Sequence, residues 1–282
     1  MLIDTETAYR RVVTELAKYP SWTVDVETNG LNPYGCNQIC GIGVGVNKDT
    51  TYYLPFRHQQ GTNLSPEILT DFITLMGLRT ELIGYNLKFD LRFLQNEGLI
   101  LENIQLIDVM LLVRLTADST VKELGLTKTI IRFYGEAAGQ YDIETKKLLR
   151  SNKWNKDFSL APPKILGDYC EKDVYWTQRL YIDCLNKVQN SKQGDILNLE
   201  YNLTKVLYDM ENRGILIDTK YASMAQEKLL ERQTEVATQI YGLSNREFNI
   251  RSTQETGEMF HSLGIHSEIL TPKGKESWSE GA

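Results

Sequence analysis

The order of strand-like and helix-like segments in the N-terminal part of the chain restricts its fold more than any other feature. Three strand patterns come first, at residues 22–27, 39–46 and 51–56. Short buried strand patterns then alternate with helical ones, at residues 82–84, 87–97, 104–108 and 109–115. A meander of strands followed by strand–helix alternation predicts an α/β domain with a mixed sheet flanked by helices.

Helix signals extend this pattern. Residues 5–19 are predicted as a helix with Asp4 as its N-cap and Pro20 as its stop. Two further helices are predicted at residues 66–76 and 167–187, and residues 139–163 are interpreted as irregular.

A glycine-rich run, GIGVGV at residues 41–46, allows two interpretations. A dinucleotide-binding loop would need a third glycine later in the run and a position between a strand and a helix. The run lies inside a strand pattern instead, which favours a strand whose backbone packs closely against another element.

The polar stretch at residues 186–194 predicts a domain boundary near residue 190, between a domain of residues 1–190 and a smaller all-helical segment of residues 191–282. Three helices are predicted in that segment. The first has one apolar face, made of Leu199, Leu203, Val206, Leu207 and Met210. The second is long and follows a cap at Asp218, and the third follows the capping pair Ser252 and Glu255.

The bulk composition excludes several classes of protein. The net charge of −6 argues against a nucleic-acid protein that binds through a broad basic surface, although an acidic metal site remains compatible with it. No apolar run approaches the roughly 20 residues of a membrane-spanning helix, and no secretory signal is visible, so a cytoplasmic protein is expected, with an organelle left open. The four cysteines predict reduced thiols. The three histidines, His58, His261 and His266, show no metal-ligand spacing.

Two carboxylates share one face of the first predicted strand. Asp25 and Glu27 are two residues apart, so both side chains point the same way near the end of the strand. Hard oxygen ligands in such a pair suit Mg²⁺ or Mn²⁺. The pair alone is weak evidence because an Asp-x-Glu sequence is frequent by chance.

Two later segments carry polar residues at helical positions. Asn86 and Asp90 follow the strand pattern at 82–84, where Asp90 could equally be a favourable charge at a helix N-terminus. Tyr169 and Asp173 are four residues apart on a predicted helix and therefore share a face. An amphipathic helix with a packed tyrosine and an exposed acid would explain that second pair as well.

The ordered set is more specific than its parts. The segments DVETNGL at 25–31, NLKFD at 86–90 and YCEKD at 169–173 resemble the three exonuclease motifs of the DEDD superfamily, in its tyrosine subclass. This resemblance covers residues 20 to about 185 and implies a ribonuclease-H-like fold. In the second segment, LEYNL at 199–203, MENRGILID at 210–218, FNIRS at 248–252 and TPKGKES at 271–277 are similar to the start of the polymerase region of family A DNA polymerases.

The resemblance implies a site and a reaction. Asp25, Glu27, Asp90 and Asp173 would hold two divalent cations, Mg²⁺ or Mn²⁺, and Tyr169 would orient the attacking water. Leu31, Asn86 and Phe89 match family positions that contact the substrate. We therefore expect a proofreading-type 3′→5′ exonuclease acting on single-stranded DNA or a frayed primer terminus, in a bacterial or phage-infected cell, with a polymerase or another replication protein as its partner.

Three further expectations complete this interpretation. Nothing in the chain matches the polymerase palm, so no polymerase activity is expected of it, as for a truncated gene or a piece of a longer polymerase. The first alternative is a ribonuclease D-like 3′→5′ exoribonuclease, whose site would be nearly the same. The second is a non-catalytic module that binds DNA ends, which the complete set of acids disfavours.

Overall fold

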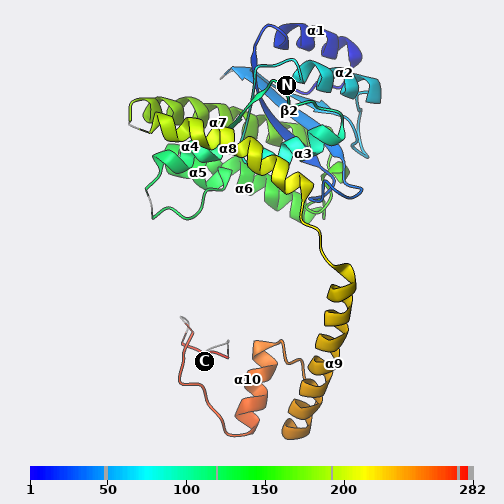
Figure 1. Cartoon of the computed structure of the whole chain (residues 1–282), viewed down its shortest axis with the longest axis vertical. Coiled ribbons are helices and arrows are strands. Elements are labelled where there is room, and N and C mark those ends of the chain that lie inside the picture. Colours follow the sequence, from blue (N-terminus) through cyan, green and yellow to red (C-terminus); the bar gives the residue numbers. More distant parts are fainter. Residues whose placement is uncertain (48–49, 119, 192, 272–273, 279–282) are drawn as a thin grey trace. The chain divides into compact units, whose positions relative to one another are not determined.

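A five-stranded mixed sheet forms the centre of the N-terminal part of the chain (Figure 1). In the order β3-β2-β1-β4-β5, the strands are Thr50–Pro55, Ile39–Asn47, Ser21–Thr28, Glu81–Gly84 and Gln105–Asp108. β1 pairs antiparallel with β2 and parallel with β4, and β4 continues parallel to β5. The predicted α/β class with a mixed sheet is confirmed.

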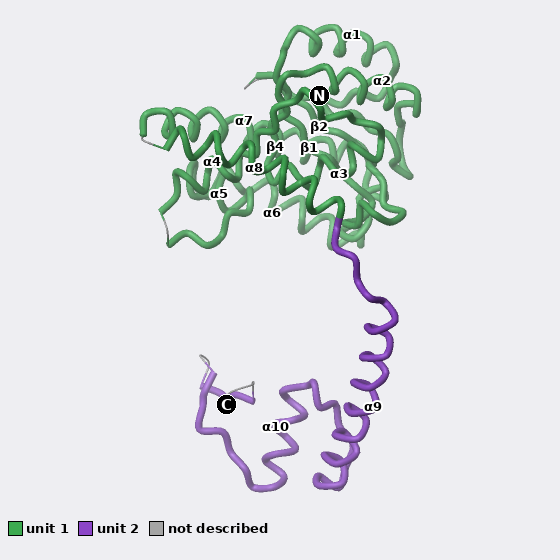
Figure 2. The backbone as a smooth tube through the Cα atoms, viewed as in Figure 1, with its two compact units in different colours: residues 1–213 green, residues 214–282 purple. Residues whose placement is uncertain are grey.

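The computed structural model describes residues 1–47, 50–118, 120–191, 193–271 and 274–278. They divide into two compact units, Met1–Arg213 and Gly214–Ala282 (Figure 2). The helices of the first unit are α1 Glu6–Leu16, α2 Pro66–Met76, α3 Lys88–Asn96, α4 Val109–Thr116, α5 Leu126–Tyr134, α6 Glu136–Ser151, α7 Pro163–Gln189 and α8 Gly194–Arg213, with a 3-10 turn at Phe158–Leu160.

Alternation along β1 divides the sheet into two faces. Trp22, Val24 and Val26 belong to the larger apolar cluster, which includes buried residues of α1, α2 and α3. Trp22 is fully buried and stacks on Phe72 of α2 at a ring-centroid distance of 5.4 Å. The residues between them, Asp25 among them, face the other side of the sheet, where α7 crosses β1, β2 and β3.

The glycine-rich run is a strand, as predicted, and its glycines let α7 approach the sheet. A Cβ atom at Gly43 would lie 2.6 Å from the sulfur of Cys170, and one at Gly45 would lie 2.8 Å from the side-chain nitrogen of Gln178. Side chains at these positions would therefore push α7 away from β2. Because α7 carries Tyr169 and Asp173, the glycines set the distance between the first and the third motif.

Three local predictions were wrong. The side chain of Thr5, not Asp4, caps α1 by accepting a hydrogen bond from the Ala8 amide. Much of the stretch predicted as irregular, residues 139–163, is helix α6. In α8 the apolar face that the periodicity marked is largely exposed, and the opposite face is buried through residues that include Tyr201 and Tyr208.

Helix α8 packs with the first unit. Its Tyr208 belongs to the larger apolar cluster, and the Lys205 ammonium donates to the carbonyl of Leu101 at 3.3 Å. The packing boundary therefore lies between Arg213 and Gly214. The predicted domain boundary near residue 190 stays a prediction.

A buried histidine links β3 to the segment before α7. The Nδ1 atom of His58 lies 2.7 Å from the carbonyl oxygen of Ala161, so Nδ1 must carry the proton. Nε2, at 2.8 Å from the hydroxyl of Tyr53, then accepts a hydrogen bond from that hydroxyl. His58 is thus a neutral core residue with both ring nitrogens satisfied.

We expect His58→Ala to cost about 2–3 kcal/mol of unfolding free energy at pH 8, because two buried hydrogen bonds and packed volume are lost. Burial lowers the pKa of His58 below its ordinary value of 6.5. The contribution of neutral His58 is therefore complete above pH 6.5 and falls as the pH drops through the lowered pKa. Urea unfolding of both proteins between pH 5 and pH 8 measures this; a difference that grows toward low pH would contradict it.

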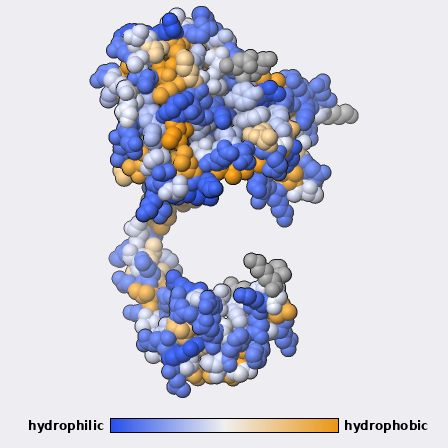
Figure 3. Space-filling model, turned by 180° about the vertical axis from the view of Figure 1, so that it is seen from behind, coloured by the Kyte–Doolittle hydropathy of each residue, from blue (hydrophilic) through white to orange (hydrophobic). Residues whose placement is uncertain are grey.

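The described residues of the second unit include two helices, α9 Thr219–Ser244 and α10 Thr253–Ser262. α9 has no buried residue, whereas α10 buries Gly257 and Met259. The surface of each unit carries exposed hydrophobic residues interspersed with hydrophilic ones (Figure 3). Among the described residues, no helix has both the length and the apolar character needed to cross a membrane.

Candidate functional site

The first two acids lie on β1, on the face covered by α7. One carboxylate oxygen of Asp25, one of Glu27 and the sulfur of Cys170 all lie within 4.8 Å of one another. Glu27 is 4% exposed, and its Oε1 atom has no hydrogen-bond partner among the described residues. A buried carboxylate oxygen without a donor is costly, so this position calls for a positive charge or a proton.

The third acid comes from α3, directly after β4. Asp90 is buried, and its Oδ1 accepts a hydrogen bond from the Val26 amide at 2.8 Å, between the two β1 acids. Asp108 at the end of β5 holds the preceding turn by accepting from the amides of Asn86 at 2.9 Å and Leu87 at 3.0 Å. Parallel β4 and β5 thus bring this motif to the strand that carries the first one.

The fourth acid comes from α7 and is held by a tyrosine that the sequence analysis missed. Asp173 is 8% exposed, and its Oδ1 accepts a hydrogen bond from the hydroxyl of Tyr141 at 2.5 Å. Tyr141 lies on α6, within the stretch predicted as irregular. No motif in the sequence marks this residue.

Tyr169 lies one helical turn before Asp173. Its hydroxyl donates to Asp142 of α6 at 3.1 Å, and the ring lies 6.1 Å from that of Tyr141. Asp142 is also paired with Lys146 at 2.8 Å. The neighbouring residues 141 and 142 of α6 therefore each contact one residue of the third motif, which gives α6 a positioning role at the site.

A buried thiol completes the inner wall. The sulfur of Cys170 donates to Oδ2 of Asp25 at 3.2 Å. Burial raises the pKa of the Cys170 thiol well above its usual range, and the charge of Asp25 adds to this effect. The thiol therefore stays protonated and orients one oxygen of Asp25.

The acids repel one another in a buried setting. Burial raises the pKa of Asp25 to about 6. The pKa of Glu27 is raised well above its usual range by burial and then by the charges of Asp25, Asp173 and Asp90. Burial and the charge of Asp25 also raise the pKa values of Asp90 and Asp173. Divalent cations would relieve this repulsion, and the oxygen-rich donor set with an unpartnered Glu27 oxygen fits Mg²⁺ or Mn²⁺.

The three residues predicted to contact substrate have different surroundings. Leu31 is 82% exposed and lines a hollow with Asn155, Lys156 and Phe158 among others. Asn86 is exposed and has a left-handed backbone with φ of 58°. Phe89 is half-buried, with its ring 5.2 Å from that of Phe93. Their roles stay predictions.

Comparison with known proteins decides the family. A family model described as a 3′-5′ exonuclease, of the type found in A-family DNA polymerases, matches residues 1–189. The chain belongs to this 3′-5′ exonuclease family. Such exonucleases normally use divalent metals, which agrees with the acid-rich site on β1, α3 and α7.

Relatives of this exonuclease are larger proteins. DNA polymerase I of Synechocystis sp. is 30% identical over 94% of this chain and 27% of its own length. The DNA-directed DNA polymerase of Pseudomonas phage M6 is 26% identical over 83% of this chain and 38% of its own length. The chain therefore spans well under half of either relative.

The fold of this exonuclease also occurs in a ribonuclease. The structure of Escherichia coli RNase D, an exoribonuclease involved in structured RNA processing, superposes with a TM-score of 0.51. The match has 14% sequence identity and covers 74% of this chain and 50% of that one. It confirms the ribonuclease-H-like fold.

Proposed function

We propose that this protein removes nucleotides one at a time from the 3′ end of single-stranded or frayed DNA, by hydrolysis that depends on two divalent cations. The observation that carries the proposal is the convergence of Asp25, Glu27, Asp90 and Asp173 from β1, α3 and α7, with one buried oxygen of Glu27 left without a donor. Three buried carboxylates and a half-buried one that repel each other destabilise a folded protein unless a ligand offsets their charge.

Each residue of the site has a defined task in this proposal. Asp25, Glu27 and Asp173 would hold one cation, and Asp25 and Asp90 the other. When bound, the two cations supply a water of lowered pKa and neutralise the scissile phosphate and the leaving 3′ oxygen. Tyr169 stays protonated because burial raises its pKa, so its hydroxyl positions the attacking water by a hydrogen bond.

The neighbouring residues would hold the nucleic acid. Exposed Leu31 and half-buried Phe89 offer apolar surfaces beside the acids for the terminal bases, and Asn86 offers an amide for the backbone. Stacking contributes about 1–3 kcal/mol per base and tolerates any base, which suits an enzyme that accepts every 3′ nucleotide.

The relatives favour DNA as the substrate. Both are DNA polymerases, and both matches extend into the second unit, whereas RNase D shares the fold at only 14% sequence identity. A replicating polymerase is accordingly the partner that we propose, with the exonuclease acting on its mispaired primer ends.

We expect the purified chain to shorten a 5′-labelled single-stranded DNA stepwise in the presence of Mg²⁺ and to stop when EDTA is added in excess. Mn²⁺ should restore the reaction and Ca²⁺ should not, because Ca²⁺ takes more ligands at longer distances. Products resolved on a sequencing gel measure the direction of cleavage. A DNA that is bound equally well with and without EDTA, yet never shortened, would favour the non-catalytic end-binding alternative.

A matched RNA oligonucleotide of the same sequence provides the control for substrate class. We expect the DNA to be degraded faster at equal concentration and at saturating Mg²⁺. Faster degradation of the RNA would favour the ribonuclease D-like alternative.

A further inference from the structure

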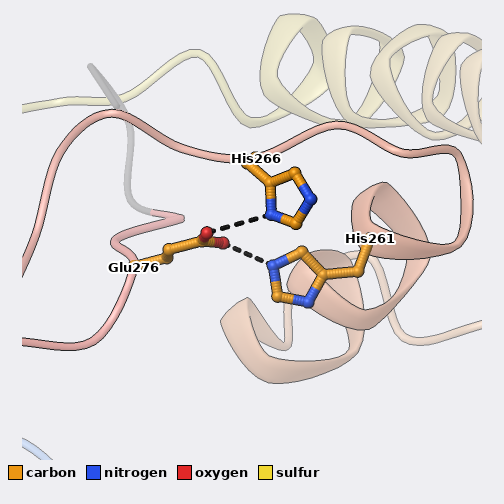
Figure 4. A group of neighbouring side chains, drawn as sticks. All are labelled: His261, His266 and Glu276. Atoms are coloured by element: carbon orange, nitrogen blue, oxygen red, sulfur yellow. Dashed lines mark hydrogen bonds and ion pairs between the residues drawn. The ribbon is translucent and has the colours of Figure 1, made fainter.

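Three metal-ligating side chains meet in the second unit, and none of them belongs to the acid-rich site of the first unit. The imidazoles of His261 and His266 both lie beside the Glu276 carboxylate, one toward each of its oxygens (Figure 4). Nδ1 of His266 lies 3.1 Å from Oε1 of Glu276, and Nε2 of His261 contacts Oε2. One ligand atom from each of the three residues lies within 4.8 Å of the other two. The sequence analysis found no metal-ligand spacing for either histidine, and that interpretation was wrong, because four residues separate the two, as in many zinc-ligating pairs.

The end of α10 brings the two histidines together. His261 lies in the last turn of the helix, and Gly264 follows with a left-handed φ of 73°. The amide of Ile265 returns to the carbonyl of Phe260 at 3.0 Å, which is the hydrogen bond of a glycine-terminated helix end. The chain therefore reverses within five residues, and His266 comes to lie beside His261 with ring centroids 5.1 Å apart.

A backbone reversal brings the glutamate to the histidines. Leu270 and Glu276 form an antiparallel bridge, and the amide of Ser277 donates to the carbonyl of Ile269 at 2.7 Å. Trp278 then packs on α10, with its ring 5.1 Å from Phe260 and 5.5 Å from His261. The backbone pairing with Leu270 and the packing of nearby Trp278 on α10 therefore fix the position of Glu276, whose side chain is 26% exposed.

We propose that His261, His266 and Glu276 form a binding site for one divalent transition metal ion of the Zn²⁺ or Ni²⁺ type. Two imidazole nitrogens and one carboxylate are a donor set that such ions prefer over Mg²⁺. Ligand distances of about 2.0–2.2 Å from one ion require the three donor atoms to lie a few ångströms apart, as they do here. The histidine side chains are 46% and 68% exposed, so the ion can enter from solvent and keep water in its remaining positions.

The ion would stabilise a unit with a very small core. Met259 is the one hydrophobic residue of the described part of this unit that is buried, at 6% exposure. Small units with little apolar burial commonly gain stability from a metal. Here the ion would connect the end of α10 to the segment around Glu276, which the backbone pairing joins to Ile269.

Quenching of Trp278 emission by Ni²⁺ tests the site locally, because the ring lies against His261. The full chain is titrated with Ni²⁺ in millimolar Mg²⁺, so that the carboxylates of the first unit are occupied. We expect saturable quenching at one equivalent of Ni²⁺, and loss of that signal in Trp278→Phe. His261→Gln and His266→Gln should each weaken Ni²⁺ binding by at least about tenfold, since even partners of metal ligands contribute 10–100-fold.

Glu268→Gln is the matched control, because Glu268 is an exposed acid of the same segment that lies outside the cluster. Its titration should match that of the wild type, and all variants should retain wild-type helicity by circular dichroism and unchanged hydrolysis of DNA. Quenching that does not saturate would overturn the proposal. So would quenching of both histidine variants at the same Ni²⁺ concentrations as the wild type. Because the readout is Trp278, the result is independent of whether the acids of the first unit catalyse hydrolysis.

Discussion

Asp173→Ala is expected to reduce the rate of 3′ nucleotide removal by on the order of 10³–10⁴-fold at saturating Mg²⁺. The carboxylate would be one of the ligands of the cation that activates water, and a bound cation contributes several kcal/mol to the transition state. The loss is expected in the chemical step, so single-turnover rates on a 5′-labelled strand provide the measurement. Asp25→Ala should have an effect of the same size.

Folding offers the second readout for this prediction. Because burial and Asp25 raise the pKa of Asp173, removing its charge relieves repulsion in the metal-free protein. Asp173→Ala should therefore unfold in EDTA at a temperature no lower than the wild type, and added Mn²⁺ should stabilise it less. Asp168→Ala is the control, since Asp168 lies on the same helix with an exposed side chain paired to Lys164. A rate within tenfold of the wild type would remove Asp173 from the site.

Tyr169→Phe is expected to slow single-turnover hydrolysis by about 10²–10⁴-fold while metal affinity changes little. The variant loses one hydroxyl, which in the structure donates to Asp142 at 3.1 Å, and it keeps all four carboxylates of the site. The ring still packs against the small apolar cluster of Cys40, Leu149, Ala161 and Leu166. A Mn²⁺ titration read by thermal stability measures the metal affinity. An unchanged rate would mean that Tyr169 only packs.

Tyr141→Phe separates positioning of the water from positioning of a ligand. Its hydroxyl donates to Asp173 at 2.5 Å, so its loss should weaken Mn²⁺ binding, and raised Mn²⁺ should restore much of the rate. The same addition should not rescue Tyr169→Phe. Equal rescue of both variants would show that the two hydroxyls act alike, through the ligands.

The main features of the fold and of the acid site could be predicted because the decisive residues lie on regular elements. Period-two alternation identified β1 and put Asp25 and Glu27 on one face. The N-x-x-x-D segment follows β4 and enters α3, and the Y-x-x-x-D segment lies on α7. Local periodicity is strong in both helices. The order of these segments along the chain then indicated the family.

Helix α6 escaped prediction because the stretch that begins at Gly139 was interpreted as irregular. In the structure that glycine is a packing residue, since a Cβ there would lie 2.5 Å from Ile131 of α5. With the helix unrecognised, the contacts that Tyr141 and Asp142 make with the third motif could not be foreseen. The pairing of His261 with His266 could have been foreseen, because their His-x4-His spacing falls within the range of zinc ligands. The position of Glu276 depends on the backbone pairing of Leu270 with Glu276, which no local sequence pattern marks.

The short connection between α8 and α9 has a practical consequence for handling the enzyme. Ile215, Leu216 and Ile217 are 91%, 98% and 67% exposed, and they follow a glycine with a φ of 70°. Extended, accessible apolar residues are good substrates for proteases of broad specificity, such as elastase or subtilisin. Every acid and both tyrosines of the site precede this connection, so a single cut would release a fragment of residues 1 to about 215 that carries the complete site. Limited digestion during purification would therefore place the candidate exonuclease site and the proposed metal site on different fragments.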